Sequence, residues 1–172
     1  MKKIELIKPE IKDLWFRRDC MADPETMSYN AGYDVSYKGY HYDTGCIDFP
    51  EDEWETWHKT KFSNPNFYYA YILDVETNQF VGYLNYHLSG DRYEMGIVIN
   101  SKFQGQGYMR PAMLKFMETA KQNGVTVLWD SVPKNREKAM KVFFDLGFEV
   151  VEEFYSKKFG KDDLCYIIKK EL

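Results

Sequence analysis

The sequence predicts an α+β domain built on a mostly antiparallel central sheet of about seven strands. Two observations lead to this prediction. The middle of the chain holds three extended runs rich in aromatic and β-branched residues, separated by short turns, as in an antiparallel meander. Residues 93–120 then change from an extended run through a glycine-bearing loop to apolar residues at helical spacing. We therefore expect sheet and helices in one fold.

The N-terminal part is predicted to contain one strand and three helices. Residues 3–7 alternate weakly between apolar and charged side chains, which indicates a strand. A proline in the first helical turn sacrifices no intrahelical hydrogen bond, so Pro9, Pro24 and Pro50 each mark a helix start. Three acidic residues directly follow Pro50 and strengthen that assignment, because they complement the helix dipole.

Residues 29–49 lie between these helices and show no helical period. The segment contains five tyrosines, which is too aromatic for a flexible linker. A long ordered loop of this kind is usually functional. We interpret it as a flap on the substrate side, the alternative being a surface loop that merely carries tyrosines.

The second half of the chain supplies the other strands. Short polar turns connect the first three of them, and Gly124 and Gly147 end the two intervening helices. The strands are expected at residues 67–75, 79–88, 93–99, 125–130, 148–157 and 164–170.

The loop Gln104-Gly105-Gln106-Gly107, followed by Tyr108-Met109, joins the third of these strands to a helix. Glycines leave the first N–H groups of the helix accessible, and those donors together with the helix dipole favour a phosphate or pyrophosphate. A P-loop would require Gly-Lys-Ser/Thr, and a dinucleotide fingerprint would require a third glycine at Arg110. A turn that only connects two elements is the remaining alternative.

Composition limits the other possibilities. The chain of 172 residues, 44% hydrophobic and 17% aromatic, is expected to form a single domain over residues 1–172. The charged N-terminus and the lack of a long apolar stretch favour a cytoplasmic protein without a membrane or nucleic-acid partner. Three widely spaced cysteines and three isolated histidines match neither a disulfide framework nor a metal site, so no metal is expected.

Charge is distributed unevenly along the chain. Residues 19–57 contain ten acidic residues and one basic residue, whereas the whole chain has a net charge of −4. An acidic front would suit a cationic substrate, and the basic remainder would suit a phosphorylated cofactor. A solvated acidic face explains the pattern equally well.

Two motifs resemble the signatures of the GCN5-related N-acetyltransferase (GNAT) family. Gln104, Gly107 and Met109 occupy the positions of its acyl-CoA-binding motif Gln/Arg-x-x-Gly-x-Gly/Ala, with Met109 in place of a small residue. The run KNREKAMKVFFDLGF is similar to the second signature, Asn-x-x-Ala-x-x-Leu-Tyr-x-x-x-Gly-Phe. The wording YEMG…GQGYM is closest to ribosomal-protein N-terminal acetyltransferases.

The resemblance implies a three-layer fold, with a mixed, mostly antiparallel sheet and helices on both faces. It also implies that acetyl-CoA is bound and that an acetyl group moves to a primary amine, such as a small cationic amine or a peptide N-terminus. The acyl-CoA-binding core would span about residues 67–172 and the acceptor-side helices and loop about residues 10–62. The implied cofactor-binding residues are Ile97, Val98, Ile99, Gln104, Gly105, Gln106, Gly107, Tyr108, Met109, Asn135 and Phe143.

The same signature differs at two positions that matter for the chemistry. Arg136 falls at the asparagine position, with Asn135 one residue early. Phe143 falls at the position of a tyrosine often proposed to protonate the CoA thiolate, so Tyr155, Tyr108 or water would have to serve. These differences leave open a non-catalytic acyl-CoA-binding module.

An amine acceptor must lose a proton before it attacks the thioester. Glu94 is the first candidate for the base, because it alternates with Gly96 and Val98 on one strand face, and Asp130 is the second. A structural carboxylate is the alternative for Glu94. For the acceptor we expect contacts from Tyr33, Tyr37 and Trp54, through cation–π interaction. A larger acyl group and a homodimer are left open.

Overall fold

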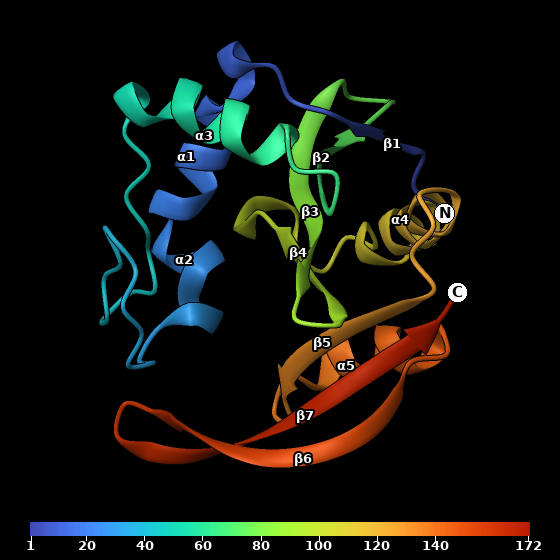
Figure 1. Cartoon of the computed structure of the whole chain (residues 1–172). Coiled ribbons are helices and arrows are strands. Elements are labelled where there is room, and N and C mark those ends of the chain that lie inside the picture. The colour runs from blue at the N-terminus through green and yellow to red at the C-terminus, as the bar shows by residue number, and fades with distance from the viewer.

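The computed structural model describes residues 1–172 and contains one seven-stranded sheet in the order β1-β2-β3-β4-β5-β7-β6 (Figure 1). The strands are β1 Ile4–Ile7, β2 Phe67–Asp74, β3 Gln79–Ser89, β4 Arg92–Ile99, β5 Val127–Pro133, β6 Glu149–Lys158 and β7 Lys161–Glu171. All seven lie close to the predicted positions, and β5 extends further toward the C-terminus because it pairs with β7 as far as Pro133.

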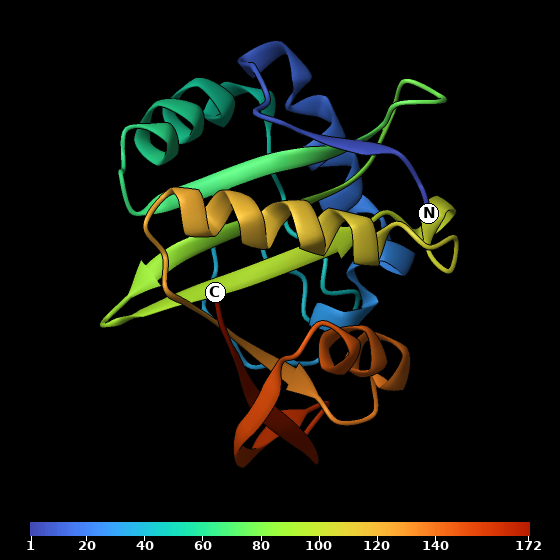
Figure 2. The same ribbon diagram turned by 90° about the vertical axis from the view of Figure 1, so that its right-hand side faces the viewer.

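Five α-helices and four 3₁₀ turns accompany the sheet. The α-helices are α1 Trp15–Ala22, α2 Pro24–Met27, α3 Trp54–Phe62, α4 Met109–Gln122 and α5 Glu137–Asp145. The 3₁₀ turns are η1 Ile11–Asp13, η2 Ser28–Asn30, η3 Glu51–Glu53 and η4 Ser101–Phe103. Helix α4 lies across one face of the sheet, and α1 and α3 lie behind the other face (Figure 2).

Strand β2 shows why the helices occupy both faces. Successive side chains of a strand point to opposite faces. Tyr69 and Tyr71 pack with Phe16 of α1, whereas Ala70 and Ile72 belong to the cluster that contains the apolar face of α4. Because both faces are buried, the strand is apolar and aromatic throughout, without the polar alternation of a strand that faces water. The expected three-layer arrangement is confirmed.

The pairing of β4 with β5 positions the site. Every neighbouring pair of strands is antiparallel except this one, which is parallel and joins only Tyr93 to Leu128 and Glu94 to Trp129. Strand β4 continues to Ile99 and β5 to Pro133, but no further residues pair. The two strands therefore separate into an open V beyond Glu94, with β5 running away below β4 (Figure 1).

The aromatic segment 29–49 contains no α-helix, as expected, although its first two residues belong to η2; residues 31–50 form an ordered loop. It contains one isolated bridge, between Tyr40 and Ile47, and it buries Cys46 and Phe49. The loop contacts the tip of the β6–β7 hairpin, where the N–H of Phe159 donates to the carbonyl of Gly32 at 2.7 Å. This contact links the N-terminal and C-terminal parts of the chain beside the open V.

No helix of this structure combines the length and the apolar character needed to cross a membrane. The three cysteines are free and buried. The structure contains no group of three or more His, Cys, Asp or Glu side chains placed to hold a metal ion.

Candidate functional site

A cavity of about 320 Å³ opens where β4 and β5 separate. Its walls come from α2 and η2, the end of β4, the loop before α4, the segment before α5, and the end of β6. The lining residues are Thr26, Ser28, Tyr29, Ile97, Val98, Ile99, Gln104, Pro133, Asn135, Arg136 and Lys158. We call this cavity the β4–β5 cleft.

A larger cavity of about 750 Å³ lies between α5 and β7. It shares only Asn135 with the β4–β5 cleft and contains no residue of β4 or of the glycine loop. Because unpaired strand edge and glycine loop meet only in the smaller cavity, the β4–β5 cleft is the candidate site.

The end of β4 provides one wall, and its outer edge is not paired with another strand. Ile97, Val98 and Ile99 line the cleft, and their strand pairs with β3 on one side only. A strand edge without a partner can pair with an extended ligand through main-chain hydrogen bonds. These three residues, which are predicted to bind the cofactor, therefore lie together on one wall of the cleft.

The glycine loop continues from this wall. Gly105 and Gly107 have φ angles of +73° and +85°, and a Cβ atom at either position would meet no protein atom within 4 Å. The side chain of Gln104 is turned back, because its Nε2 donates to the carbonyl of Ile99 at 2.9 Å. Open space beside these glycines, at the start of the 14-residue helix α4, fits an anionic group such as a pyrophosphate.

The side chains of three other residues of this loop make contacts outside the cleft. Tyr108 is buried, and its hydroxyl donates to Oδ2 of Asp74 at 2.5 Å, so it is not free to protonate a ligand. Met109 packs against the main core. Gln106 is exposed and donates to the carbonyl of Lys102 at 2.8 Å. Only backbone groups of these residues remain available to a cofactor.

The segment before α5 forms the opposite wall. Arg136 falls at the asparagine position of the second signature, and Asn135 stands one residue before it. Both residues line the cleft, so either could contact a ligand there. Phe143 does not line it. Its ring is 2% exposed in the main core, 5.2 Å from the ring of Phe148 in edge-to-face contact. The expected cofactor contact of Phe143 is therefore replaced by a packing role.

Glu94 and Asp130 lie where β4 and β5 begin to separate. Glu94 is paired with Trp129 across the strands, directly before Asp130, and its Oε2 is 3.7 Å from Nε2 of His87. The pKa of Asp130 is raised to about 7, mainly by burial and to a smaller extent by the charge of Glu94, while the N–H of Ser131 and the charge of Arg136 act to lower it. Neither carboxylate lines the cleft itself, but both stand at its closed end.

Tyr155 is not brought to the cleft. It lies on the outer strand β6, is 71% exposed and does not line the cavity. Sequence reasoning instead missed Tyr29, which lines the cleft. Arg136 lies over its ring at 5.2 Å, and burial raises the pKa of its hydroxyl. The five tyrosines of residues 29–49 signalled a tyrosine here, but only the tertiary fold selects which one.

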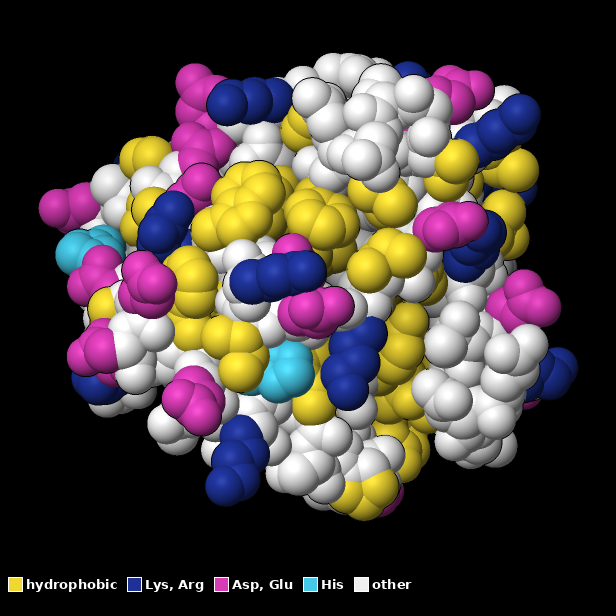
Figure 3. Space-filling model, turned by 90° about the horizontal axis from the view of Figure 1, so that it is seen from above, with side chains coloured by type: hydrophobic (Ala, Val, Ile, Leu, Met, Phe, Trp, Pro, Cys, Tyr) yellow, Lys and Arg dark blue, Asp and Glu magenta, His cyan; other side chains and the backbone are white.

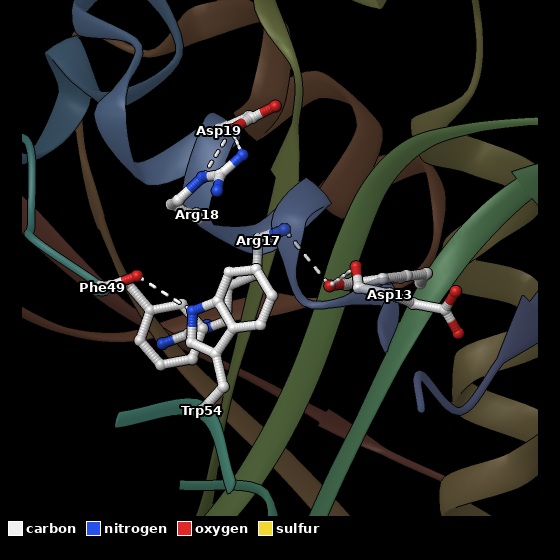
Figure 4. A network of polar contacts seen from close by, with 7 residues as sticks. Asp13, Arg17, Arg18, Asp19, Phe49 and Trp54 are labelled. Carbon is white, nitrogen blue, oxygen red and sulfur yellow. Dashed lines mark hydrogen bonds and ion pairs between the residues drawn. The ribbon is translucent and has the colours of Figure 1, made fainter. Parts of the chain in front are cut away.

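The expected acceptor-binding aromatics are not gathered in one place. The indole of Trp54 is buried, stacks on Phe49 and donates to the Phe49 carbonyl at 3.0 Å (Figure 4). Tyr33 donates to Oδ2 of Asp163 at 2.9 Å, at the β6–β7 hairpin. Tyr37 is 61% exposed and contacts Tyr40. Trp54 is therefore part of the core rather than an acceptor contact.

The acidic front also lies outside the cleft. Seen from above, acidic side chains gather on the left of the molecule, the side of segment 31–50, with Lys and Arg among them (Figure 3). No acidic residue lines the cleft, whereas Arg136 and Lys158 do. The local charge of the site is therefore opposite to that of the front.

Comparisons with known proteins agree with this geometry. Residues 3–149 match the family model of the acetyltransferase (GNAT) domain. No curated protein sequence matches the chain. A spermidine N-acetyltransferase from Vibrio cholerae, solved with CoA and spermine, is 16% identical with a TM-score of 0.78, covering 98% of this chain and 95% of that one.

Two further solved structures share the fold. A GNAT-family acetyltransferase from Streptococcus pneumoniae is 15% identical with a TM-score of 0.76, covering 99% of this chain and 100% of that one. A Salmonella typhimurium protein, solved with its cofactor acetyl-CoA, is 14% identical with a TM-score of 0.76, covering 98% and 94%. At these identities the likeness shows the seven-stranded mixed fold.

Proposed function

The chain belongs to the GNAT acetyltransferase family, and we propose that it is an N-acetyltransferase that moves an acetyl group from acetyl-CoA to a primary amine. The observation that carries the proposal is the β4–β5 cleft, in which an unpaired strand edge leads directly into an open glycine loop. The ribosomal-protein branch suggested by the wording of the motif stays a prediction.

The residues of the cleft fit acetyl-CoA in two parts. The backbone of Ile97–Ile99 would pair with the extended pantetheine arm, and the N–H groups of residues 104–109 would hold the pyrophosphate. Asn135 and Arg136 would contact the arm from the opposite wall. When bound, acetyl-CoA supplies the activated acetyl group as a thioester.

The transfer requires one bond to form and one to break. The amine nitrogen bonds to the acetyl carbonyl carbon, the carbon–sulfur bond breaks, the amine loses a proton and the departing sulfur gains one. The backbone N–H near Val98 would donate to the carbonyl oxygen, where negative charge develops.

A carboxylate at the closed end of the cleft would remove the proton of the amine. An aliphatic amine has a pKa of about 10.4, so it arrives protonated near neutral pH. Glu94, acting through water, stays our first candidate, and Asp130 has the pKa that suits a base working at neutral pH. For the departing sulfur, Tyr29 is the only tyrosine that lines the cleft, and water is the alternative donor.

The reaction requires an amine nitrogen in the acceptor, and the residues of the cleft restrict the choice of acceptor only a little further. A small cationic amine and a peptide N-terminus both supply the required nitrogen. The spermidine N-acetyltransferase that shares the fold binds spermine. In this chain the charged residues that line the cleft are Arg136 and Lys158, so polycations are not favoured.

The test is an acceptor screen with product detection. The protein is incubated with acetyl-CoA and a panel of polyamines, amino acids and peptides, and acetylated products are identified by mass. We expect at least one amine to gain an acetyl group at a rate that depends on protein concentration. Tight CoA binding with no acetylated product from any amine would instead identify a binding module.

A further inference from the structure

Arg17 is a buried cation without an acidic partner. It lies on α1 (Figure 4), and its backbone N–H donates to the hydroxyl of Tyr71. Nη1 of its guanidinium donates to the hydroxyl of Tyr69 at 3.3 Å, whereas Nε is enclosed and has no partner. The next residue, Arg18, is ordinary by comparison, because it pairs with Asp19 at 2.8 Å near the surface. The guanidinium of Arg17 therefore retains unused hydrogen-bonding capacity.

Aromatic rings hold this guanidinium in place. Measured from Cζ to the ring centroids, the distances are 4.5 Å for Trp57, 5.1 Å for Phe49, 5.3 Å for Tyr69 and 5.8 Å for Tyr83. Ring faces attract a cation, but they do not satisfy its N–H groups. A guanidinium fixed by rings on several sides is a rigid, planar donor for a carboxylate.

The guanidinium does not line the β4–β5 cleft itself, but Tyr83 connects it to the cleft wall. Tyr83, which contacts it, is paired across the sheet with Val98, a residue of the cleft wall. Tyr29 also lines the cleft and packs against the same aromatic cluster. As a whole residue, Arg17 is partly buried and partly exposed.

Other charged side chains near the cleft also suggest that its ligand carries a negative group. Arg136 lies over the ring of Tyr29, and Nζ of Lys158 donates to the Tyr29 carbonyl at 3.3 Å. Two cationic side chains thus contact Tyr29, while Glu94 and Asp130 stand at the closed end between β4 and β5. An acceptor with a positive end and a negative end would match this separation of charge.

We propose that the acceptor amine carries a carboxylate on the same molecule, and that the guanidinium of Arg17 binds this carboxylate while the amine faces Glu94 and Asp130. This inference rests on the proposed function, because it names the substrate class of the same site. It also explains why a cation is kept buried among aromatic rings with no acidic residue beside it.

The test compares ω-amino acids of graded chain length with their amides. Each pair shares the same primary amine and differs in the carboxylate. We expect kcat/KM to be at least about tenfold higher for the acid of the best length, since charge-assisted hydrogen bonds are the strong ones. The preference should disappear in Arg17→Gln and shrink in Arg17→Lys, which keeps the charge but loses the planar fork.

Arg18→Gln is the matched control, because it removes the neighbouring arginine of the same helix and should keep the preference. CoA affinity, measured by calorimetry, shows whether each variant is folded. If Arg17→Gln does not fold, the wild-type comparison and Arg17→Lys decide. Equal kcat/KM for acid and amide in the wild type, or a preference that persists in Arg17→Gln, would overturn the proposal.

A second readout separates this inference from the proposed function. The CoA-saturated protein is titrated with N-acetyl ω-amino acids and with the corresponding amides. Tighter binding of the acids, lost in Arg17→Gln, is expected even if no acceptor is turned over. If amines are acetylated without any preference for a carboxylate, the proposed acetyltransferase function is supported and the role of Arg17 is rejected.

Discussion

Asp130 holds its proton in a pH range where an ordinary aspartate has lost it. Burial is the main cause of its pKa of about 7, with the charge of Glu94 acting in the same direction and Arg136 against it. In the unfolded chain the pKa is about 3.9. Between these two values the folded protein binds more protons than the unfolded chain, so stability falls as pH rises and the full cost remains above pH 7.

Asp130→Asn should therefore stabilise the protein in a pH-dependent way. We expect its free energy of unfolding to exceed that of the wild type by more than ~1 kcal/mol at pH 8 and to differ little near pH 4. Urea unfolding at both pH values measures this. Asp91→Asn, in the exposed β3–β4 turn, should change stability at neither pH. An equal gain for Asp130→Asn at both pH values would show that folding does not raise the pKa of Asp130.

Glu94→Gln tests the base of the reaction. Its kcat/KM should fall by roughly a hundredfold near pH 7, and the loss should shrink at high pH, where the amine is already free. The half-exposed carboxylate is 3.7 Å from His87, so His87→Asn controls for a purely structural role and should keep most of the activity. Wild-type rates in Glu94→Gln, together with slow turnover in Asp130→Asn, would transfer the role to Asp130.

Residue type and motif position were insufficient to place several side chains. The place of Tyr108 in the glycine loop predicts a contact with the cofactor, but its hydroxyl donates to Asp74, 34 positions away in the sequence. Residue type predicts that Trp54 contacts the acceptor, and motif position predicts that Phe143 contacts the cofactor. Both side chains are buried in packed clusters. Which side of an element faces the cleft depends on packing with distant segments, so the sequence pattern did not decide it.

At the scale of elements, the loop between β4 and α4 combines two functions, because it turns the chain and leaves room for a ligand. Gly107→Val would place a β-branched side chain in that room. We expect the affinity for CoA to fall at least tenfold, about 1.4 kcal/mol, with the fold retained. Calorimetry with CoA measures the change.

Gly124→Val is the matched control for this loop. Gly124 follows the other end of α4 and has a φ of +86° against +85° for Gly107, and a Cβ atom there would likewise meet no protein atom within 4 Å. Both variants share the backbone strain of a valine at positive φ. Only the one beside the cleft should weaken CoA binding, and equal affinities in both variants would mean that the loop does not hold the cofactor.

Elements were predicted better than side chains because their signals are local. The helical period of α4, the turns of the β2–β4 meander and Gly147 after α5 are all short-range patterns. The separation of β4 from β5 is different. It depends on a parallel pairing between distant segments, such as Tyr93 with Leu128, which residue patterns alone do not reveal. The family resemblance implied a mixed sheet without naming the parallel pair.

At the scale of the whole molecule, net charge is a poor guide to the site. Six of the ten acidic residues of the front lie in the loop and in η3, mostly exposed, and some of them are paired locally, such as Asp48 with His41 at 2.9 Å. The cleft carries basic side chains instead. A long-range attraction for cations is therefore not expected to control turnover.

Neutralising Glu51, Asp52 and Glu53 together tests this view. These residues form the exposed 3₁₀ turn η3, and Glu53 forms an ion pair with Lys38. The triple variant should unfold at a slightly lower temperature and keep its kcat/KM and its salt dependence. A clear fall in activity at low salt, repeated in the wild type at high salt, would restore the acidic front as a steering surface.

Amide hydrogen exchange with and without CoA tests the position of the cofactor site most directly, because it locates the cofactor on the whole fold. Saturating CoA should slow exchange at residues 96–99, on the β4 wall of the cleft, and at residues 104–109, in the glycine loop that continues from that wall. Exchange at the start of β6 and the end of β7, away from Lys158, should not change. Protection confined to the larger cavity between α5 and β7, or no protection anywhere, would contradict the assignment of the β4–β5 cleft as the acetyl-CoA site.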